Sequence, residues 1–585
     1  MWNNMLIENI KSPADVKKLD DAALETLAAE ARAALIQKLS KHGGHAGPNL
    51  GMVEATIALH YVFESPKDKI VFDVSHQSYT HKMLTGRAAA FLDESKYDDV
   101  TGYTEPCESE HDQFMVGHTS TSVSLALGLA TARDIKGEKG NIVAVIGDGS
   151  LSGGEAFEGL DNAGEYATNF IVVVNDNEMS IAENHGGLYA SLAELRATNG
   201  KSENNYFKSL GFEYCYVEQG NDLQTLIAAF KQVKDSTKPV VVHIHTQKGK
   251  GLPFAEQNRE GFHWSCPFDA KTGVQNWGSG ESWGGILSDY LMKKIKADPK
   301  VVVIHSAVPA GIGFFAPQRK EAGKQYIDVG IAEEHAVALA SGLAKGGAKP
   351  IYSTHSTFIQ RAYDQLSQDL CANSNPATIL VTMSGADGMN DTTHLCVFDI
   401  PMMSNIPNLV YLCPTCVEEA YAMMDFAVEQ TERPIAIRIP NRVFHRSAAF
   451  DKDFSNVSYK IDKQGSEVAI IGLGDFYHRG LAVAAELAKK GINATIVNPR
   501  FASSLDESVL DNLKANHKVV VTLENGVAEG GFGSKIASFY GNSNMKVLVK
   551  GLKKEFYNKV PFDELCTRNR LNPDQIAEDV FEALM

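Results

Sequence analysis

Gly147-Asp148-Gly149 and Asn175-Asp176-Asn177 are the two stretches from which the fold of this chain can be inferred. Each follows an apolar run, residues 141–146 and 170–174, that is typical of a buried parallel strand. Because the carboxyl ends of neighbouring parallel strands meet at one edge of a sheet, these polar residues are expected to lie together. Oxygen ligands in that arrangement suit a hard divalent cation, which can in turn hold a diphosphate. Tight turns use the same residue types, but the helix-length interval between Asp148 and Asn177 favours the cation site.

The composition is that of a globular protein too long for a single core. The chain has 585 residues, of which 44% are hydrophobic and 22% charged, and about three or four domains are expected at this length. The net charge of -17 argues against a nucleic-acid surface. Eight scattered cysteines do not suggest a disulfide framework, and we find neither a leader nor an apolar run of the roughly 18 residues that span a membrane. We therefore expect a cytoplasmic protein with no nucleic-acid or membrane partner.

Three loops that precede Gly147 carry histidines. They span residues 41–47, 73–81 and 116–122, and they contain His42 and His45, His76 and His81, and His118. A single loop histidine is usually exposed to solvent, but three such loops flanked by small and hydroxyl residues indicate a polar, ligand-sized cleft. A further histidine, His263, follows within Gly-Phe-His-Trp at 261–264.

The pattern after residue 286 is a repeated alternation of strand-like and helix-like stretches, which predicts a parallel sheet covered by helices. Residues 265–285 are rich in Gly, Ser, Asn and Trp without periodicity and are typical of a linker. Another strand-like run, 468–471, follows a polar stretch. We predict an α/β fold of three consecutive parallel-sheet domains with boundaries at 1–275, 276–455 and 456–585.

With these motifs assembled, the chain resembles the thiamine-diphosphate-dependent transketolase family, and within it the 1-deoxy-D-xylulose-5-phosphate synthases, as a shortened or divergent member. The resemblance covers nearly the whole chain. Four stretches carry most of it: residues 44–51, 147–149 with 175–180, 331–336 and 356–365. It implies a homodimeric, transketolase-like enzyme with thiamine diphosphate and Mg²⁺ as cofactors. Its first domain would hold the diphosphate, its second the aminopyrimidine, and its third would be a transketolase C-terminal domain.

The reaction that the resemblance implies is a decarboxylative condensation of small-molecule substrates. Pyruvate would be joined to D-glyceraldehyde 3-phosphate to give 1-deoxy-D-xylulose 5-phosphate, a precursor of isoprenoids, thiamine and pyridoxal. A transketolase-like transfer of a two-carbon ketol unit, or a synthase-like reaction with another aldehyde, stays open. So does an inactive cofactor-binding paralogue with a regulatory or structural role. Retention of Asp148, Asn177 and Glu333 together favours an active enzyme.

The resemblance also implies roles for individual residues. Asp148, Asn177 and the backbone carbonyl of Met179 would bind Mg²⁺. The contacts to thiamine diphosphate would come from His76, Gly117, His118, Thr119, Gly149, Ser150, Asn177, Glu333 and Phe358. His45 and His263 would face the reacting carbon, and the substrate would be bound by Arg361, Arg438, His355, Asn390 and His394. A buried carboxyl group with a raised pKa beside the pyrimidine ring, here Glu333, is the group that such chemistry needs.

The departures from the family pattern concentrate on the acceptor side. Met383 stands where the family has the arginine of Arg-Ala-Gly, and the unreplaced loss of such a phosphate contact costs about 1.5–3 kcal/mol. Either Asn390 or, after a three-residue shift, Asp387 matches the family's aspartate. His355 replaces a tyrosine and Leu252 an aromatic residue, and the chain between residues 180 and 240 is shorter than usual. Whether residues 191–207 form a mobile lid is left open.

Overall fold

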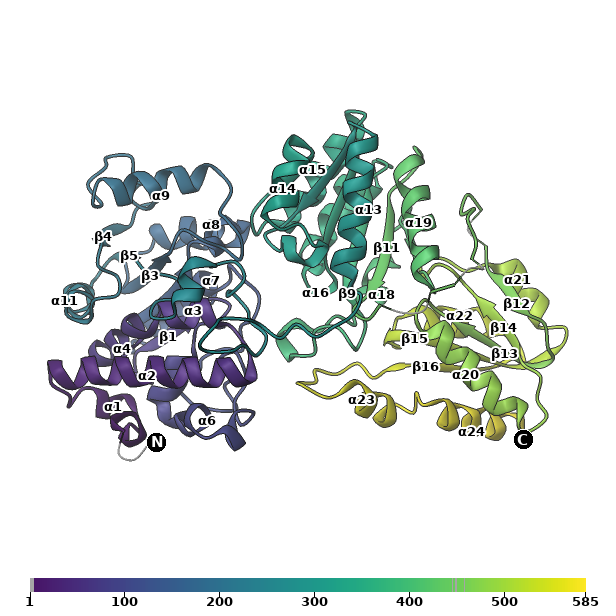
Figure 1. Cartoon of the computed structure of the whole chain (residues 1–585), viewed down its shortest axis with the longest axis horizontal. Helices are drawn as coiled ribbons and strands as arrows, with labels where there is room; N and C mark the ends of the chain where they lie inside the picture. Colours follow the sequence, from purple (N-terminus) through teal and green to yellow (C-terminus); the bar gives the residue numbers. More distant parts are fainter. Residues whose placement is uncertain (1–4, 444–445, 448–449, 457) are drawn as a thin grey trace. The chain divides into compact units, whose positions relative to one another are not determined.

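The computed structural model describes residues 5–443, 446–447, 450–456 and 458–585. The chain divides into two compact units, Met1–Ser279 with Gly330–Ala332, and Gly280–Val329 with Glu333–Met585 (Figure 1). In the described part of the chain, every helix is too short or too polar to cross a membrane.

The first unit contains a five-stranded parallel sheet in the order β1-β2-β3-β5-β4. Its strands are β1 (Lys69–Phe72), β2 (Ile142–Gly147), β3 (Phe170–Asp176), β4 (Glu213–Val217) and β5 (Pro239–His245). The strands predicted at 141–146 and 170–174 are therefore confirmed. All seven residues of β3 are buried, which explains why the strand reads as a continuous run of valine and isoleucine rather than as an alternating pattern.

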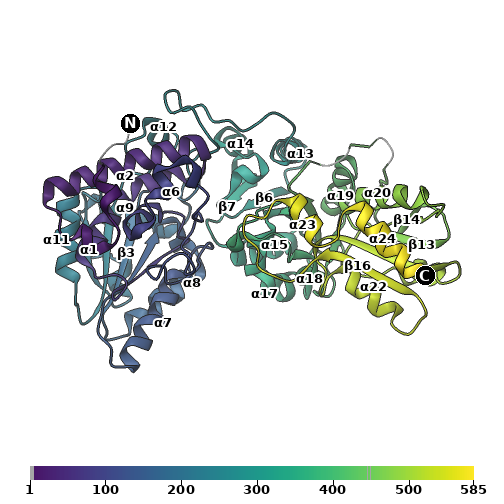
Figure 2. The ribbon, with the colours of Figure 1, turned by 90° about the horizontal axis from the view of Figure 1, so that it is seen from below.

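Helices cover both faces of this sheet. Ile171 and Val173 of β3 face the apolar cluster that contains α2 (Asp21–His42), α4 (Val53–Val62) and α11 (Leu223–Val233). Val172 and Val174 face the opposite cluster, with α7 (Ser122–Ile135), α8 (Gly154–Gly164) and α9 (Gly187–Ala197). Figure 2 shows β3 between α2 and the α7–α8 layer. The shorter helices of the unit include α1 (Pro13–Val16), α3 (Ala46–Gly51), α5 (Tyr79–Lys82), α6 (Ala89–Leu92), α10 (Tyr206–Ser209) and α12 (Pro253–Gln257).

The second unit begins with a six-stranded parallel sheet in the order β10-β11-β9-β8-β6-β7. Its strands are β6 (Val301–His305), β7 (Tyr326–Asp328), β8 (Lys349–His355), β9 (Thr378–Ser384), β10 (Val410–Leu412) and β11 (Ile435–Pro440). The longer helices associated with it are α13 (Trp283–Ala297), α14 (Ala316–Ala322), α15 (Glu333–Lys345) and α19 (Val417–Glu429). Strand β9 continues through Met383 to Ser384, and Met383 adopts a left-handed φ of 57°.

A second sheet of the same unit has the order β12-β14-β13-β15-β16, and β12 alone is antiparallel to its neighbour. Its strands are β12 (Lys460–Lys463), β13 (Glu467–Gly472), β14 (Thr495–Asn498), β15 (His517–Val527) and β16 (Lys546–Leu552). One face packs on α20 (Phe476–Ala488), α23 (Phe562–Arg568) and α24 (Pro573–Leu584), and the other on α21 (Glu507–Leu513) and α22 (Phe532–Tyr540). The predicted α/β class with three parallel-sheet layers is confirmed, whereas the domain boundaries stay predictions.

Val173 tests how strongly the first unit depends on its central strand. Val173→Ala removes two methyl groups from a fully buried position, and we expect it to lower the free energy of unfolding of this unit by about 2 kcal/mol. Urea unfolding followed by intrinsic fluorescence measures the loss. Ile135→Ala, at an 81% exposed position, is the control and should stay within about 0.5 kcal/mol of the wild type. Equal stability of the two variants would contradict the assignment of β3 as the core strand.

Candidate active site

The ends of β2 and β3 form one continuous edge in the first unit. The backbone N–H of Asp148 donates to the carbonyl of Asn175 at 3.0 Å, which extends the pairing of the two strands into their turns. Asp148 and Asn177 therefore leave adjacent strands at the same edge, as the sequence predicted. Gly149 is required beside them, because a Cβ on it would lie 2.9 Å from the backbone and side chain of Ser180.

Two buried aspartates at this edge differ in how their charge is balanced. Asp176 pairs with Arg196 at 2.5 Å and with His243 at 2.9 Å. Asp148 makes no ion pair within the described residues. It accepts hydrogen bonds from the side-chain amide of Asn184 at 2.6 Å and from the backbone N–H of Asn177, and the positive charge of Lys248 acts on it from beyond ion-pair distance. Burial raises the pKa of Asp148, and the negative charge of Asp176 raises it further. Asp148 is thus the carboxylate at this edge whose charge the protein leaves for another cation to balance.

The donor set fits a divalent cation with oxygen ligands. Asn177 Oδ1 is buried and has no hydrogen-bond partner, which is unusual for a buried amide oxygen and is expected of one reserved for a ligand. Met179 lies two residues further on, in a loop closed by its bridge to Glu183. No group of three or more His, Cys, Asp or Glu side chains suited to a metal occurs among the described residues. A carboxylate, an amide oxygen and a backbone carbonyl are instead the ligands that a hard cation such as Mg²⁺ takes.

Three of the predicted histidines come together in the first unit. The ring centroids of His45 and His76 are 4.8 Å apart, those of His76 and His263 are 5.3 Å apart, and those of His45 and His263 are 5.6 Å apart. Burial lowers the pKa of His45 and of His263 well below the ordinary value, and neighbouring positive groups lower both further. Both rings are therefore neutral near pH 7, with one nitrogen able to donate a proton and one able to accept it.

Backbone pairing and one asparagine hold these histidines together. Gly44 and Ser265 exchange two backbone hydrogen bonds of 2.9 Å, which places the loop of His45 beside that of His263. The side-chain amide of Asn49, which is fully buried, donates to the carbonyls of His45 and His76 at 2.7 Å each. Its oxygen accepts from the N–H of Tyr79 at 2.9 Å. Asn49 belongs to the stretch 44–51 that carries part of the family resemblance, but the sequence does not reveal that its side chain links the loops of His45 and His76.

The third predicted loop is attached to the second through Asp73 and Ser75. Asp73 accepts backbone hydrogen bonds from Ser120 at 2.9 Å and Ser122 at 3.0 Å. Ser75 Oγ donates to the carbonyl of Val116 at 2.6 Å. The intervening chain is strained, since Val74 and Ser75 both have left-handed φ values, 57° and 62°, which a β-branched residue such as valine rarely adopts. The turn formed by Gly117, His118 and Thr119 is thereby fixed relative to His76.

The third loop is also attached to the cation edge, because Ser120 Oγ donates to the carbonyl of Ser150 at 2.8 Å. Gly149 and Ser150 follow Asp148 directly and are buried. The residues predicted to contact the diphosphate therefore belong to connected loops of one unit.

Lys248 is a functional candidate to which sequence reasoning assigned no role. Its ammonium group is buried, donates to the carbonyl of Ser180 at 2.5 Å and lies 3.2 Å from Nδ1 of His263. Burial lowers its pKa to about 7. The signal was present in the sequence, since a lysine in Lys248-Gly249-Lys250-Gly251 directly follows the loop after a buried strand.

Two of the loop histidines, His81 and His42, do not join the cluster. The ring of His81 lies between His60 and Asp112, with nitrogen contacts of 2.8 Å on each side, and Arg87 pairs with Asp112 from the other direction. His42 pairs with Asp98 near the surface. Neither residue was predicted to belong to the site: His81 turns into the core and His42 turns towards solvent.

In the second unit, Glu333 begins α15 as expected. Its carboxyl group is 3% exposed, Oε2 has no hydrogen-bond partner, and Arg361 Nη1 lies 3.6 Å from that oxygen. Burial raises the pKa of Glu333 to about 7, even though Arg361 opposes the shift. A carboxyl group that is partly protonated near neutral pH can donate a hydrogen bond to a ring nitrogen.

An aromatic group lies in the same unit. Phe358 stacks on His355 with ring centroids 5.7 Å apart and meets His394 edge-on at 5.8 Å. His355 Nδ1 lies 2.8 Å from Thr382 Oγ1, and burial lowers the pKa of His355 to about 4. His355 is therefore neutral where the family pattern has a tyrosine.

The remaining acceptor-side residues have defined partners. Arg438 is buried, donates to Asp399 at 2.6 Å and to the carbonyl of Asn525 at 2.7 Å, so a phosphate at this position would compete with a carboxylate. Asn390 donates to the carbonyl of Val560 at 3.4 Å. Asp387 accepts from the side chain of Asn525 at 3.2 Å. The choice between Asn390 and Asp387 stays open.

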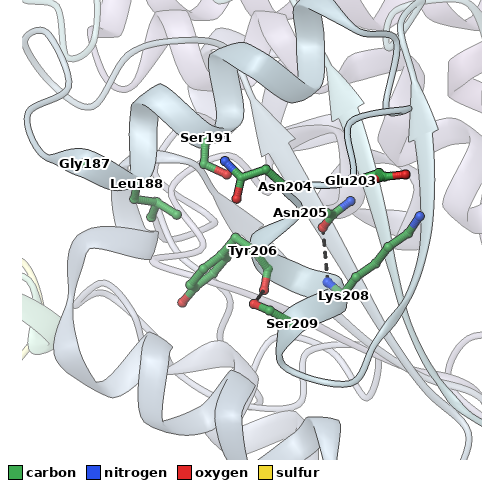
Figure 3. Close-up of a pocket in the computed structure, with 9 residues that line it drawn as sticks. All are labelled: Gly187, Leu188, Ser191, Glu203, Asn204, Asn205, Tyr206, Lys208 and Ser209. Atoms are coloured by element: carbon green, nitrogen blue, oxygen red, sulfur yellow. Dashed lines mark hydrogen bonds between the residues drawn. The ribbon is translucent and has the colours of Figure 1, made fainter.

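A surface pocket of 670 Å³ lies at the segment that the sequence left undefined (Figure 3). Its lining comes from α9, from α10 and from the loop that precedes α10. The side chains are mainly polar, and they belong to Leu188, Ser191, Glu203, Asn204, Asn205, Tyr206, Lys208 and Ser209. None of them is a predicted site residue.

Comparison with known proteins agrees with this geometry. Residues 7–204 and 197–246 match the family model described as 1-deoxy-D-xylulose-5-phosphate synthase, residues 280–445 the pyrimidine-binding domain of transketolase, and residues 458–576 its C-terminal domain. A 1-deoxy-D-xylulose-5-phosphate synthase from Symbiobacterium thermophilum is 38% identical, over 99% of this chain and 95% of its own length. One from Carboxydothermus hydrogenoformans is also 38% identical, over 94% of each chain.

The chain belongs to the 1-deoxy-D-xylulose-5-phosphate synthase family. Among solved structures, a transketolase from Pichia stipitis matches 96% of this chain and 97% of its own, at 15% identity and a TM-score of 0.46. The family assigned from the motifs is thus confirmed, while the roles of individual residues in this family member stay predictions.

Asp112 should contribute strongly to the free energy of unfolding of this protein. Asp112→Ala would leave Arg87 and His81 buried without their shared carboxylate, and we expect a loss of about 3–5 kcal/mol in the free energy of unfolding. Although burial alone would raise the pKa of Asp112, hydrogen bonds from Arg87 and His81 hold it far below its usual range. Denaturant unfolding at pH 7 measures the loss, with the exposed Asp98→Ala as control. A cost below about 1 kcal/mol would contradict the buried network.

The carboxyl group of Glu333 should make stability depend on pH. The pKa of Glu333 is about 7 in the folded state, whereas the ordinary pKa of a glutamate is 4.5, so the folded state holds the proton more tightly. This favourable contribution is present below pH 4.5 and is lost as pH rises through 7. Glu333→Gln removes it, so wild type should lose on the order of 3 kcal/mol relative to the variant between those pH values. Unfolding midpoints of both proteins across this range measure the difference. Parallel pH profiles would contradict the raised pKa.

Proposed function

We propose that this chain catalyses the decarboxylative condensation of pyruvate with D-glyceraldehyde 3-phosphate to 1-deoxy-D-xylulose 5-phosphate, which supplies isoprenoid, thiamine and pyridoxal synthesis. It is a transferase that depends on thiamine diphosphate and a divalent cation. The observation that carries the proposal is the edge of the first sheet, where Asp148 is buried and makes no ion pair within the described residues, and where Asn177 Oδ1 has no hydrogen-bond partner. Three neutral or partly buried histidines occur in the same unit.

The metal ion and the diphosphate of the cofactor would be held by residues of the first unit. Asp148, Asn177 and the carbonyl of Met179 would hold Mg²⁺. The diphosphate and the rest of the cofactor would contact His76, Gly117, His118, Thr119, Gly149, Ser150 and Asn177. Thiamine diphosphate, when bound, supplies the stabilisation of a carbanion at a former carbonyl carbon, which no side chain provides.

Glu333 would hold a proton on its carboxyl group and donate it in a hydrogen bond to the pyrimidine ring, on which Phe358 would stack. Its raised pKa supports this role, because an ordinary glutamate would be ionised at neutral pH and could not donate. Arg361, which lies near Glu333, opposes the shift and keeps the pKa close to neutrality instead of higher.

His45 and His263 would exchange protons with the substrate oxygens. Their neutral state supports this, since a neutral imidazole can both give and accept a proton as the substrate changes. The positive charge of Lys248, which lies 3.2 Å from His263 Nδ1, would lower the pKa of that ring and favour its neutral form.

On the acceptor side, Arg361, Arg438, His355, Asn390 and His394 would contact the aldehyde. Met383 contributes no hydrogen bond to a phosphate, and Arg438 is already paired with Asp399. These two observations favour a second candidate, in which the same cofactor chemistry acts on an aldehyde that carries no phosphate.

We also propose the domain boundaries 1–275, 276–455 and 456–585, a homodimeric state and a cytoplasmic location. All eight cysteines lie in the described part of the chain and none of them forms a disulfide there, which supports a reducing compartment. Size-exclusion chromatography with light scattering tests the dimer.

Product identification tests the reaction. With Mg²⁺, thiamine diphosphate, pyruvate and D-glyceraldehyde 3-phosphate, we expect carbon dioxide and 1-deoxy-D-xylulose 5-phosphate, identified by mass spectrometry. A panel of free and phosphorylated aldehydes distinguishes the second candidate, and a ketose donor distinguishes transketolase-like transfer. If pyruvate gives neither carbon dioxide nor a new carbon–carbon bond, the proposal is lost.

Glu333→Ala tests the role of the carboxyl group within this reaction. Turnover should fall by a factor of about 10²–10⁴, whereas most binding of Mg²⁺ and diphosphate, measured by calorimetry, should remain. The control Glu334→Ala changes the adjacent residue of the same helix. Full activity of Glu333→Ala would refute the role assigned to this carboxyl group. If the wild type itself were inactive but bound the cofactor, the result would instead favour an inactive cofactor-binding paralogue.

A further inference from the structure

Residues 184–196 bring three side chains to the cation edge of the first unit. Asn184 donates from its side-chain amide to Asp148 Oδ2 at 2.6 Å. Tyr189 donates from its hydroxyl to the backbone carbonyl of Asp148 at 3.2 Å. Arg196 donates to Asp176 at 2.5 Å. One segment therefore contacts the carboxylate of Asp148, the backbone of Asp148 and the carboxylate of Asp176.

Helix α9 gives the segment a firm base. Tyr189 and Arg196 are seven residues apart and so lie on one face of the helix. Leu192 and Leu195 are fully buried in the apolar cluster that includes Val172 and Val174 of β3. The hydrogen-bonding groups are therefore positioned by packing against the strand that ends at Asp176.

Asn184 itself carries a second feature that points to a ligand. Its Oδ1 is buried and has no hydrogen-bond partner, as is also true of Asn177 Oδ1. The bridge between Met179 and Glu183 folds the intervening loop back on itself and returns Asn184 to the strand ends. One carboxylate and two unpartnered amide oxygens therefore belong to a single loop system.

We propose that Asn184 is a positioning residue of the divalent-cation site, and that residues 184–196 form the support that keeps Asp148 oriented for the cation. The inference rests on the proposed function, because it assumes that Asp148 binds a cation there. By fixing one carboxylate oxygen, Asn184 restricts the rotation of the group before the cation arrives. Tyr189 restricts the backbone of Asp148 through its hydrogen bond. Arg196 balances the negative charge of Asp176, so that the charge of Asp148 is the one left for the cation.

The pocket between α9 and α10 supplies matched controls. Ser191 and Leu188 of α9 line the pocket of Figure 3 together with residues of α10. Asn204 and Tyr206 lie at that pocket and have the same residue types as Asn184 and Tyr189. Both control residues lie outside residues 184–196, so changing them removes none of the hydrogen bonds that Asn184, Tyr189 and Arg196 donate at the cation edge.

Binding of Mn²⁺ in the presence of thiamine diphosphate, measured by electron paramagnetic resonance on the full chain, tests the proposal without any turnover. Asn184→Ala should raise the Kd for Mn²⁺ about 10–100-fold, the usual effect of losing a partner that orients a metal ligand. Tyr189→Phe should raise it about 2–10-fold, the equivalent of one hydrogen bond. Asn204→Ala and Tyr206→Phe should leave it within about twofold of the wild-type value.

Thermal unfolding without cation or cofactor separates positioning from general stability. We expect Tyr189→Phe and Tyr206→Phe to unfold at closely similar temperatures while differing in Mn²⁺ affinity. Wild-type affinity in both Asn184→Ala and Tyr189→Phe would overturn the inference and leave the proposed function intact. Absence of Mn²⁺ binding by the wild-type chain would instead remove the cation site itself, and the proposed function with it.

Discussion

The buried charge of Asp148 is the constraint on which the first unit is organised. A carboxylate removed from water is costly unless it is paired or bound to a cation. Here the side-chain amide of Asn184 and the backbone N–H of Asn177 donate to Asp148, and no ion pair to it forms within the described residues. Asp176, one strand away, shows the alternative, since Arg196 and His243 satisfy it within the protein. Asp176 is therefore a structural charge that is paired within the protein, whereas Asp148, which has no such ion pair, is the one available to a ligand.

Preorganisation is the second theme of the site. Asn49 links the loops of His45 and His76, Asp73 links the loop of His76 to residues 120–122, and Ser120 links that turn to Ser150. The strained backbone at Val74 persists because these contacts over-determine it. Groups held in this way lose little freedom when a ligand binds, which leaves more of the contact energy for affinity and for the reaction.

In the second unit, burial shifts the pKa of an acid and of a base in opposite directions. Glu333 keeps a carboxyl group with a pKa of about 7, whereas His355 is held neutral by burial with a pKa of about 4. Burial opposes the charged form in both cases, so it favours the protonated state of an acid and the deprotonated state of a base. Arg438 is the exception, because Asp399 and the carbonyl of Asn525 offset its loss of solvent.

The sequence by itself determined the α/β class, the strands around Asp148 and Asn177, the start of the helix at Glu333 and the family. These features depend on local periodicity, on turn residues and on motifs within a few neighbouring positions. Only the tertiary structure decided that His45, His76 and His263 meet while His81 turns into a buried pair with Asp112. It also decided that Lys248, Asn49 and Asn184 contact His263, His76 and Asp148, respectively. The physical reason is that loops of similar composition differ in which side chain they bury, and that choice depends on hydrogen bonds between residues up to some 220 positions apart, as between Gly44 and Ser265.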